Sequence, residues 1–84
     1  MILSWSEQAW EDYLYWQKND KRKLKRINEL IKAISRNHFE GIGDPEPLKY
    51  NWTGYWSRRI DREHRVVYKV AGNNLIIAQC RYHY

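Results

Sequence analysis

The residues that could carry out acid–base chemistry lie in the second half of the chain. Glu46 stands between Pro45 and Pro47, which restrict its backbone, and its carboxylate could act as a general base. His83 has an imidazole that can give or take a proton near neutral pH, and Tyr84 adds a phenol beside it. Cleavage of RNA without a metal needs such a pair, because the 2′-hydroxyl must lose a proton and the departing 5′-oxygen must gain one.

Cations suited to a phosphate accompany these groups. The cleavage reaction also adds negative charge at phosphorus, which cations or hydrogen-bond donors must stabilise. Lys49, Arg59 and Arg65 are candidates, and a guanidinium can hold a phosphate through two parallel hydrogen bonds. Arg81 and Tyr82 could also bind RNA, since a tyrosine ring offers a face on which a base can stack.

Each of these residues also has a simpler structural interpretation. A Pro-Glu-Pro segment is often only a rigid loop with an exposed carboxylate, and Arg58-Arg59 in a strand can protect a sheet edge from aggregation. A histidine near a chain end is often disordered. His38 and His64 fall in turn-like segments, where we expect exposed or capping side chains, although His64 precedes Arg65 and could touch a substrate.

Composition excludes several classes of protein. The one cysteine, Cys80, leaves no internal disulfide and reads as a small buried hydrophobe. The three histidines form no HxxxH or HExxH pair, so we expect neither a metal site nor a cofactor. No segment approaches the roughly 20 apolar residues of a membrane span, and the first residues lack a signal-peptide pattern, which favours the cytoplasm.

The charge pattern points to a polyanionic partner. The chain of 84 residues, which we expect to form a single domain over residues 1–84, has a net charge of +5. Its basic residues gather in residues 18–36 and 49–69. Nucleic acid is the leading candidate for the partner, although lysines and arginines on a helix can simply form a solvated face.

The first half of the chain reads as a strand followed by two helices. A strand over Ile2–Trp5 precedes Ser6, which can cap a helix whose apolar stripe is Trp10, Tyr13 and Leu14. Asn19-Asp20 interrupts this helix, and Asp20 can cap a second one. The apolar residues of the second helix recur at helical spacing: Leu24, Ile27, Leu30, Ile31 and Ile34. The two helices are predicted to form an amphipathic hairpin.

The second half reads as β structure after a loop over residues 38–47 that contains two glycines and two prolines. Three strand-like runs follow, separated by turn-rich segments: Tyr55–Ile60, Arg65–Val70 and Leu75–Tyr82. Leu48–Trp52 could form a further short strand. The sequence therefore predicts an α+β fold, with an N-terminal strand, a two-helix hairpin and then an antiparallel β-meander.

The pairing of the last two strands decides which candidate residues meet. We expect the core face of the last strand to be Ile76, Ala78, Cys80 and Tyr82. Joining this face to that of the preceding strand requires a three-residue loop, with Ala71 opposite Leu75. Arg65 then lies opposite Arg81, and both share with His83 the face away from the helices.

Several stretches together match a known family pattern. They are Pro45-Glu46-Pro47-Leu48, Gly54-Tyr55-Trp56-Ser57-Arg58-Arg59-Ile60, Glu63-His64-Arg65-Val66-Val67-Tyr68 and Cys80-Arg81-Tyr82-His83-Tyr84. With Trp5-Ser6-Glu7 and the helix around residues 12–17, they resemble the YoeB-type toxins of the RelE/ParE toxin–antitoxin superfamily. The resemblance covers essentially the whole chain. Tyr50 stands where relatives are expected to have histidine, and Trp52 where a smaller apolar residue is usual.

The resemblance implies a RelE-like, microbial-ribonuclease-like fold and metal-independent cleavage of mRNA in the ribosomal A site. It implies neutralisation by a YefM-type antitoxin, and family members can form homodimers. It also implies a set of roles: Glu46 as general base, Arg65 as the group that stabilises the transition state, His83 as general acid, Tyr84 at the scissile phosphate or stacked on a base, and Lys49 and Arg59 on the RNA backbone.

Two other functions remain open. A basic α+β module could block the ribosome without cleaving RNA. A ParE-like relative would instead poison gyrase, although that branch lacks the set of Glu46, Arg65 and His83.

Overall fold

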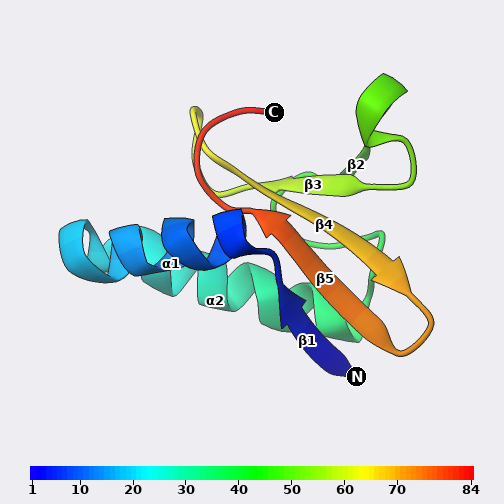
Figure 1. Cartoon of the computed structure of the whole chain (residues 1–84), viewed down its shortest axis with the longest axis horizontal. Coiled ribbons are helices and arrows are strands. Elements are labelled where there is room, and N and C mark those ends of the chain that lie inside the picture. The colour runs from blue at the N-terminus through cyan, green and yellow to red at the C-terminus, as the bar shows by residue number, and fades with distance from the viewer.

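The computed structural model describes residues 1–84 and contains one five-stranded sheet, in the order β1-β5-β4-β3-β2, with two helices packed against it (Figure 1). The elements are β1 (Ile2–Trp5), α1 (Glu7–Asn19), α2 (Lys21–Arg36), β2 (Glu46–Pro47), the 3-10 helix η1 (Tyr50–Trp52), β3 (Trp56–Arg59), β4 (Arg65–Ala71) and β5 (Asn74–Gln79). β1 is parallel to β5, whereas the other pairs are antiparallel. The predicted α+β fold is confirmed. Neither helix has the length and apolar composition that a membrane-spanning segment requires.

Both predicted helix caps are present. The Ser6 hydroxyl accepts a hydrogen bond from the Ala9 amide at 3.0 Å and donates to the Ala78 carbonyl at 2.6 Å, so it also fastens the start of α1 to the sheet. The Asp20 carboxylate accepts from the amides of Arg22 and Lys23 at the start of α2. Both caps satisfy amides at the helix starts, and the Ser6 cap also ties α1 to the residue before the end of β5.

The predicted apolar stripe of α1 is confirmed for Tyr13, which packs against the core, and is wrong for Trp10 and Leu14. The buried residues are Ala9, Asp12 and Trp16, whereas Trp10 and Leu14 are exposed. The polar atoms on the buried face explain the difference, because they pair with the backbone of one residue beyond β5. Asp12 accepts from the Cys80 amide at 3.0 Å, and the Trp16 indole donates to the Cys80 carbonyl at 2.8 Å.

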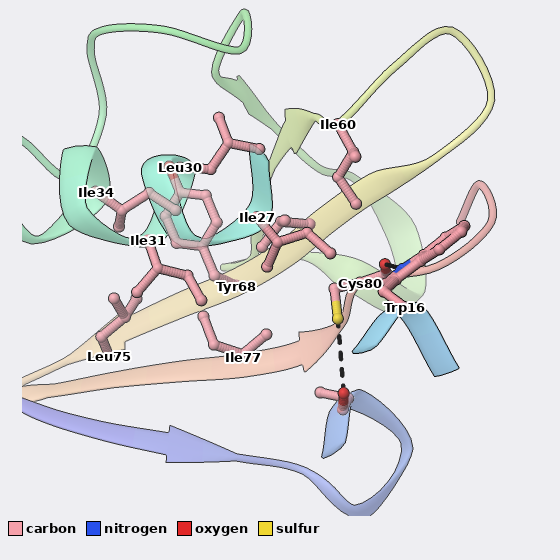
Figure 2. Close-up of a cluster of buried hydrophobic side chains, with 12 residues drawn as sticks. Trp16, Ile27, Leu30, Ile31, Ile34, Ile60, Tyr68, Leu75, Ile77 and Cys80 are labelled. Atoms are coloured by element: carbon pink, nitrogen blue, oxygen red, sulfur yellow. Dashed lines mark hydrogen bonds between the residues drawn. The ribbon is translucent and has the colours of Figure 1, made fainter. Parts of the chain in front are cut away.

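The core lies between α2 and the sheet. Ile27, Leu30, Ile31 and Ile34 of α2 are buried, as their spacing predicts, and they face Tyr68, Leu75 and Ile77 (Figure 2). Full burial of each aliphatic side chain stabilises the fold by about 1.5–3 kcal/mol.

The loop between α2 and β2 is organised by Arg58, which is fully buried. Its guanidinium donates to the carbonyls of Asn37 at 2.7 Å, Glu40 at 2.9 Å and Ile42 at 3.2 Å. The interpretation of Arg58 as edge protection is therefore wrong, because its charge is used inside the molecule. Gly43 has a φ of +85° and packs so tightly that a Cβ there would lie 2.6 Å from Leu30.

The predicted register of the last hairpin is wrong at the turn. Ala71 pairs with Asn74, so the loop has two residues, and Leu75 and Ile77 face the core in place of Ile76 and Ala78. Both sets of β5 residues are apolar, which is why alternation alone could not choose between them.

A bulge then restores the predicted pairing at the other end of this hairpin. The register shifts between Val67 and Tyr68, and Val67 pairs with Gln79. Cys80 is buried, as expected.

Three predicted segments differ in the structure. Glu46–Pro47 is a short strand inside the predicted loop, and the proposed strand at Leu48–Trp52 is instead occupied by η1. The last strand ends at Gln79 and not at Tyr82, so residues 80–84 leave the sheet as a tail.

Candidate active site

Three strands bring the predicted base and two predicted phosphate ligands to one face of the sheet. Glu46 pairs with Ser57, which pairs in turn with Val67. Arg59 pairs with Arg65 on the same two strands. Paired residues, and alternate residues along one strand, point to the same face. On β4, Arg65 and Val67 alternate with the core residues Val66 and Tyr68. The face that Glu46, Arg59 and Arg65 share is therefore the one away from the helices.

Arg65 is held rigidly on this face. Its Nη1 donates to three carbonyls of the turn between β3 and β4, those of Asp61 at 2.8 Å, Arg62 at 3.3 Å and His64 at 3.1 Å. The residue is buried, and it forms no ion pair. Carbonyl groups orient the guanidinium without neutralising it, so its positive charge stays available for an anion.

A cleft of about 410 Å³ opens beside Glu46. It is lined by Glu46, Pro47, Leu48, Lys49, Tyr50, Asn51, Trp52 and Tyr84. The cleft therefore brings a carboxylate, an ammonium group and a phenol from the two ends of the predicted site together. Asn51 and Trp52 are lining residues without a predicted role.

The tail reaches this cleft because it turns back after β5. In Figure 1 it curves away from α1 and α2, toward the side of the sheet that carries β2. Tyr82 has a φ of +65°, and its backbone is bonded on both sides: its amide donates to His64 Nδ1 at 2.7 Å, and its carbonyl accepts from the Arg65 amide at 3.1 Å. His83 is exposed, with its ring 4.5 Å from that of Tyr84.

The comparisons with known proteins identify the family of this chain. The family model described as the YoeB-like toxin of bacterial type II toxin-antitoxin systems matches residues 5–84. Toxin YoeB of Escherichia coli K12 is 63% identical over 84 residues, which is 100% of both chains. This chain belongs to the YoeB-like toxin family. It is thus the toxin of a type II toxin–antitoxin system.

Solved structures support the same assignment. A YoeB/ParE toxin from Agrobacterium tumefaciens is 50% identical with a TM-score of 0.97, and the match covers 100% of both chains. A YoeB dimer from Staphylococcus aureus is 58% identical with a TM-score of 0.94, and the match covers 100% of this chain and 98% of that one. The YoeB-YefM heterotetramer from the same organism is 58% identical with a TM-score of 0.92 and the same coverage. YafQ from E. coli, at 22% identity and a TM-score of 0.76 over 96% of this chain and 91% of that one, shares the fold.

The expected position of Arg81 is wrong for this YoeB-like chain. Its guanidinium carbon lies 3.4 Å from the ring centroid of Tyr15 on α1 and 4.5 Å from that of Tyr82. Arg81 therefore packs on the helix side and does not join Arg65 and His83. The strand has already ended at Gln79, so its alternation no longer determines where Arg81 points. That Arg81 binds RNA stays a prediction.

The expectation that His64 is exposed or serves as a cap is also wrong. His64 is buried, and its ring packs edge-on against Trp16 with the centroids 4.8 Å apart. Its partner Tyr82 is 18 residues away in the sequence, so no local pattern signals this contact.

The basic residues Lys49 and Arg59 remain accessible, and Arg59 is only loosely paired with Asp44 at 3.7 Å.

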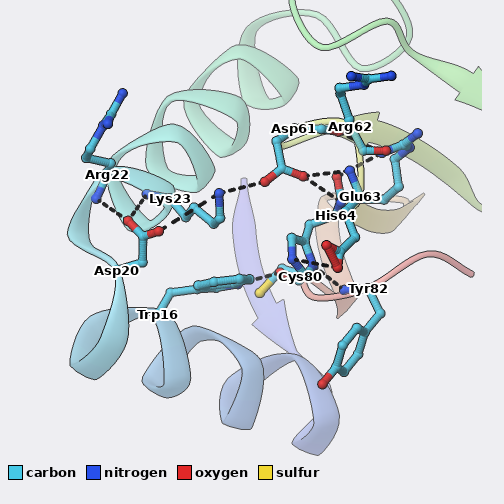
Figure 3. Close-up of polar contacts among 11 residues, drawn as sticks. Trp16, Asp20, Arg22, Lys23, Asp61, Arg62, Glu63, His64, Cys80 and Tyr82 are labelled. Carbon is cyan, nitrogen blue, oxygen red and sulfur yellow. Dashed lines mark hydrogen bonds and ion pairs between the residues drawn. The ribbon is translucent and has the colours of Figure 1, made fainter.

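A polar network fixes the turn that carries His64 and Arg65 (Figure 3). Asp61 accepts from the amides of Glu63 and His64, and Lys23 of α2 donates to its carboxylate at 2.7 Å. Partial burial opposes the ionisation of Asp61, but the hydrogen bonds from Lys23 and the two amides outweigh it and lower its pKa to about 2. The Asp61 hydrogen bond in turn raises the pKa of Lys23.

Cys80 is not a candidate nucleophile. Burial, with a smaller contribution from the charge of Asp12, raises the pKa of its thiol well above the ordinary range. The thiol lies 3.6 Å from the Ala9 carbonyl, inside the core. Its role is to pack the first residue of the tail against α1.

Proposed function

We propose that this toxin is a metal-independent, ribosome-dependent endoribonuclease that cleaves mRNA in the ribosomal A site and so inhibits translation. The observation that carries the proposal is the shared face of Glu46 and Arg65, together with the cleft where Glu46 meets Tyr84. Acid, base and cation are the groups that phosphodiester cleavage requires.

The proposed reaction uses each group once. Glu46 removes the proton of the 2′-hydroxyl, and the 2′-oxygen attacks phosphorus while the bond from phosphorus to the 5′-oxygen breaks. His83 donates a proton to the departing 5′-oxygen. Arg65, fixed by three carbonyls, stabilises the charge that develops on the phosphate. Tyr84 assists at the phosphate or stacks on a base.

The ribosome supplies what this small surface lacks. Orientation of a reactant is worth roughly 7–11 kcal/mol at most, and the A site would present the mRNA to the toxin in a fixed geometry. Lys49 and Arg59 hold the RNA backbone from the accessible rim of the face. Translating ribosomes are cytoplasmic, so we place the toxin's action there.

A YefM-type antitoxin would neutralise the toxin. The S. aureus YoeB toxin, which is 58% identical to this chain, forms a heterotetrameric complex with YefM, and this supports a similar partner here. We propose that the C-terminal segment of the antitoxin folds onto the toxin. The YoeB dimer of S. aureus supports a homodimer as a second assembly of this chain.

The decisive experiment maps mRNA 5′ ends on translating ribosomes with the wild-type toxin and with His83→Ala. We expect new 5′ ends with the wild type and a loss of roughly 10²–10⁴-fold in the variant, which is the usual contribution of one positioned acid or base. Since His83 is exposed, the variant should keep the wild-type unfolding curve.

Other results would favour other functions. Translation arrest without new 5′ ends would indicate a module that blocks the ribosome without cleaving RNA. DNA damage on expression would indicate a gyrase poison. Undiminished cleavage by His83→Ala would remove His83 from the reaction.

A further inference from the structure

We propose that His64 is a positioning residue of the active site: its neutral imidazole holds the root of the tail so that His83 and Tyr84 reach the site of cleavage. The inference rests on the proposed function for its catalytic consequence. It concerns a residue that lies outside the cleft and outside the predicted catalytic set.

The hydrogen bond itself determines the state of the ring. The Tyr82 amide lies 2.7 Å from His64 Nδ1, and an amide can only donate. Nδ1 must therefore carry a lone pair, which places the proton of the neutral ring on Nε2. Because His64 is 7% exposed, water cannot readily replace this bond.

Contacts on other sides hold the ring in place (Figure 3). Trp16 packs edge-on against it at a centroid distance of 4.8 Å, and the indole of Trp16 also donates to the Cys80 carbonyl. The His64 amide donates to Asp61 at 2.7 Å, and Asp61 is paired with Lys23. Contacts from α1, α2 and the β3–β4 turn therefore hold His64 Nδ1 in the position from which it binds the tail.

The bond from Tyr82 to His64 lies directly before the two tail residues of the predicted site, so it can determine where they are placed. Tyr82 has a φ of +65°, which non-glycine residues rarely adopt, and it is the point where the tail turns back. The next residue is the predicted acid His83, and the one after it, Tyr84, lines the cleft with Glu46. Without the His64 acceptor, the Tyr82 amide loses its partner and the turn loses one of its two backbone anchors.

The first test compares His64→Asn with His64→Leu, two side chains of nearly equal size. Only asparagine can present an acceptor to the Tyr82 amide. We expect the leucine variant to cleave mRNA on ribosomes roughly tenfold to a hundredfold more slowly, with Tyr82 amide exchange accelerated by a similar factor, because a partly buried donor is left unpaired. The asparagine variant should stay within about threefold of the wild type in both measurements.

A second variant leaves His64 untouched and removes the donor from the other side of the bond. Ligating a synthetic peptide of residues 80–84 through Cys80 to residues 1–79, followed by refolding, yields the full chain with an ester in place of the Tyr82 amide. We expect cleavage to slow roughly tenfold while the pH profile keeps its shape, since His83 and Glu46 are intact.

The results separate this inference from the proposed function. Wild-type cleavage and slow Tyr82 exchange in His64→Leu, or full activity of the ester, would overturn the inference. So would equal losses in the leucine and asparagine variants. If the wild-type toxin does not cleave mRNA, the proposed function fails and the catalytic part of the inference fails with it, whereas Tyr82 exchange still decides whether His64 anchors the tail.

Discussion

At the scale of single residues, the site depends on groups that hold the reactive ones in place. Arg65 could be recognised from the sequence as a phosphate ligand, but not the carbonyls that orient it, because they come from the turn around it. The sequence around His64 suggests an exposed turn residue, because its partner is brought to it only by the folded tail. Chemical identity is visible in a sequence, whereas burial at a turn is not.

Asp61 offers a test at this scale. Its pKa falls from 3.8 to about 2 on folding, so its ionised form stabilises the folded state above pH 3.8, and this contribution is lost as the pH falls toward 2. Asp61→Asn keeps an oxygen that can accept from the amides but loses the ion pair with Lys23. We expect destabilisation by about 1 kcal/mol at pH 7, since the pair is partly exposed.

The measurement is the free energy of unfolding in urea for both proteins between pH 2 and pH 7. The difference between them should be constant above about pH 5 and shrink to a small fraction of that value at pH 2. Lys23 does not disturb this window, because its raised pKa would change stability only at alkaline pH. A difference that persists at pH 2 would show that the ion pair is not its source.

At the scale of elements, the fold shows which patterns carry information. The α2 stripe and the caps Ser6 and Asp20 could be predicted because each depends on local spacing alone. The β4–β5 register could not, since both faces of β5 are apolar and the bulge at Val67/Tyr68 changes the pairing midway. Nor could the buried face of α1, because its members include Asp12, whose carboxylate pairs with the amide of Cys80, 68 positions away in the sequence.

The loop that delivers Glu46 to β3 is also an element-scale feature, and it depends on Arg58. Arg58→Met keeps an apolar stem like that of arginine but leaves the carbonyls of Asn37, Glu40 and Ile42 without their donor. We expect a loss of about 2–4 kcal/mol in the free energy of unfolding, from buried acceptors that lose their partners. Arg58→Lys keeps the charge but not the planar guanidinium. Its free energy of unfolding should lie between those of the wild type and Arg58→Met.

Urea denaturation measures the stability of these variants, and amide exchange in residues 37–43 reports on the loop. A stability of Arg58→Met within about 0.5 kcal/mol of the wild type would show that the loop holds itself in place. Such a result would also show that the position of Glu46 does not depend on Arg58.

At the scale of the whole molecule, net positive charge governs the encounter with a polyanion. The chain has a net charge of +5, and Lys25 and Lys32 are exposed on α2. If the toxin contacts about four phosphates of the ribosome, its affinity should fall roughly a hundredfold between 50 and 200 mM salt. Lys25→Gln and Lys32→Gln should each reduce the slope of log affinity against log salt by about one if that lysine contacts a phosphate.

Filter binding or sedimentation with intact ribosomes, over a range of salt concentrations, gives this slope. Glu7→Gln, at the start of α1, serves as a control that changes the net charge without removing a cation. An affinity independent of salt would exclude phosphate contacts as the main source of binding.

The parallel pairing of β1 with β5 has a consequence for how the chain acquires its shape during synthesis. Ile2 pairs with Asn74, and the Ser4 hydroxyl donates to the Asn74 side chain across 70 positions of sequence. The helical hairpin can form early from neighbouring residues, but the first strand must wait unpaired until β5 has left the ribosome. A protein proposed to attack translating ribosomes would thus keep its own first strand unpaired until the residues of β5 have been synthesised and released.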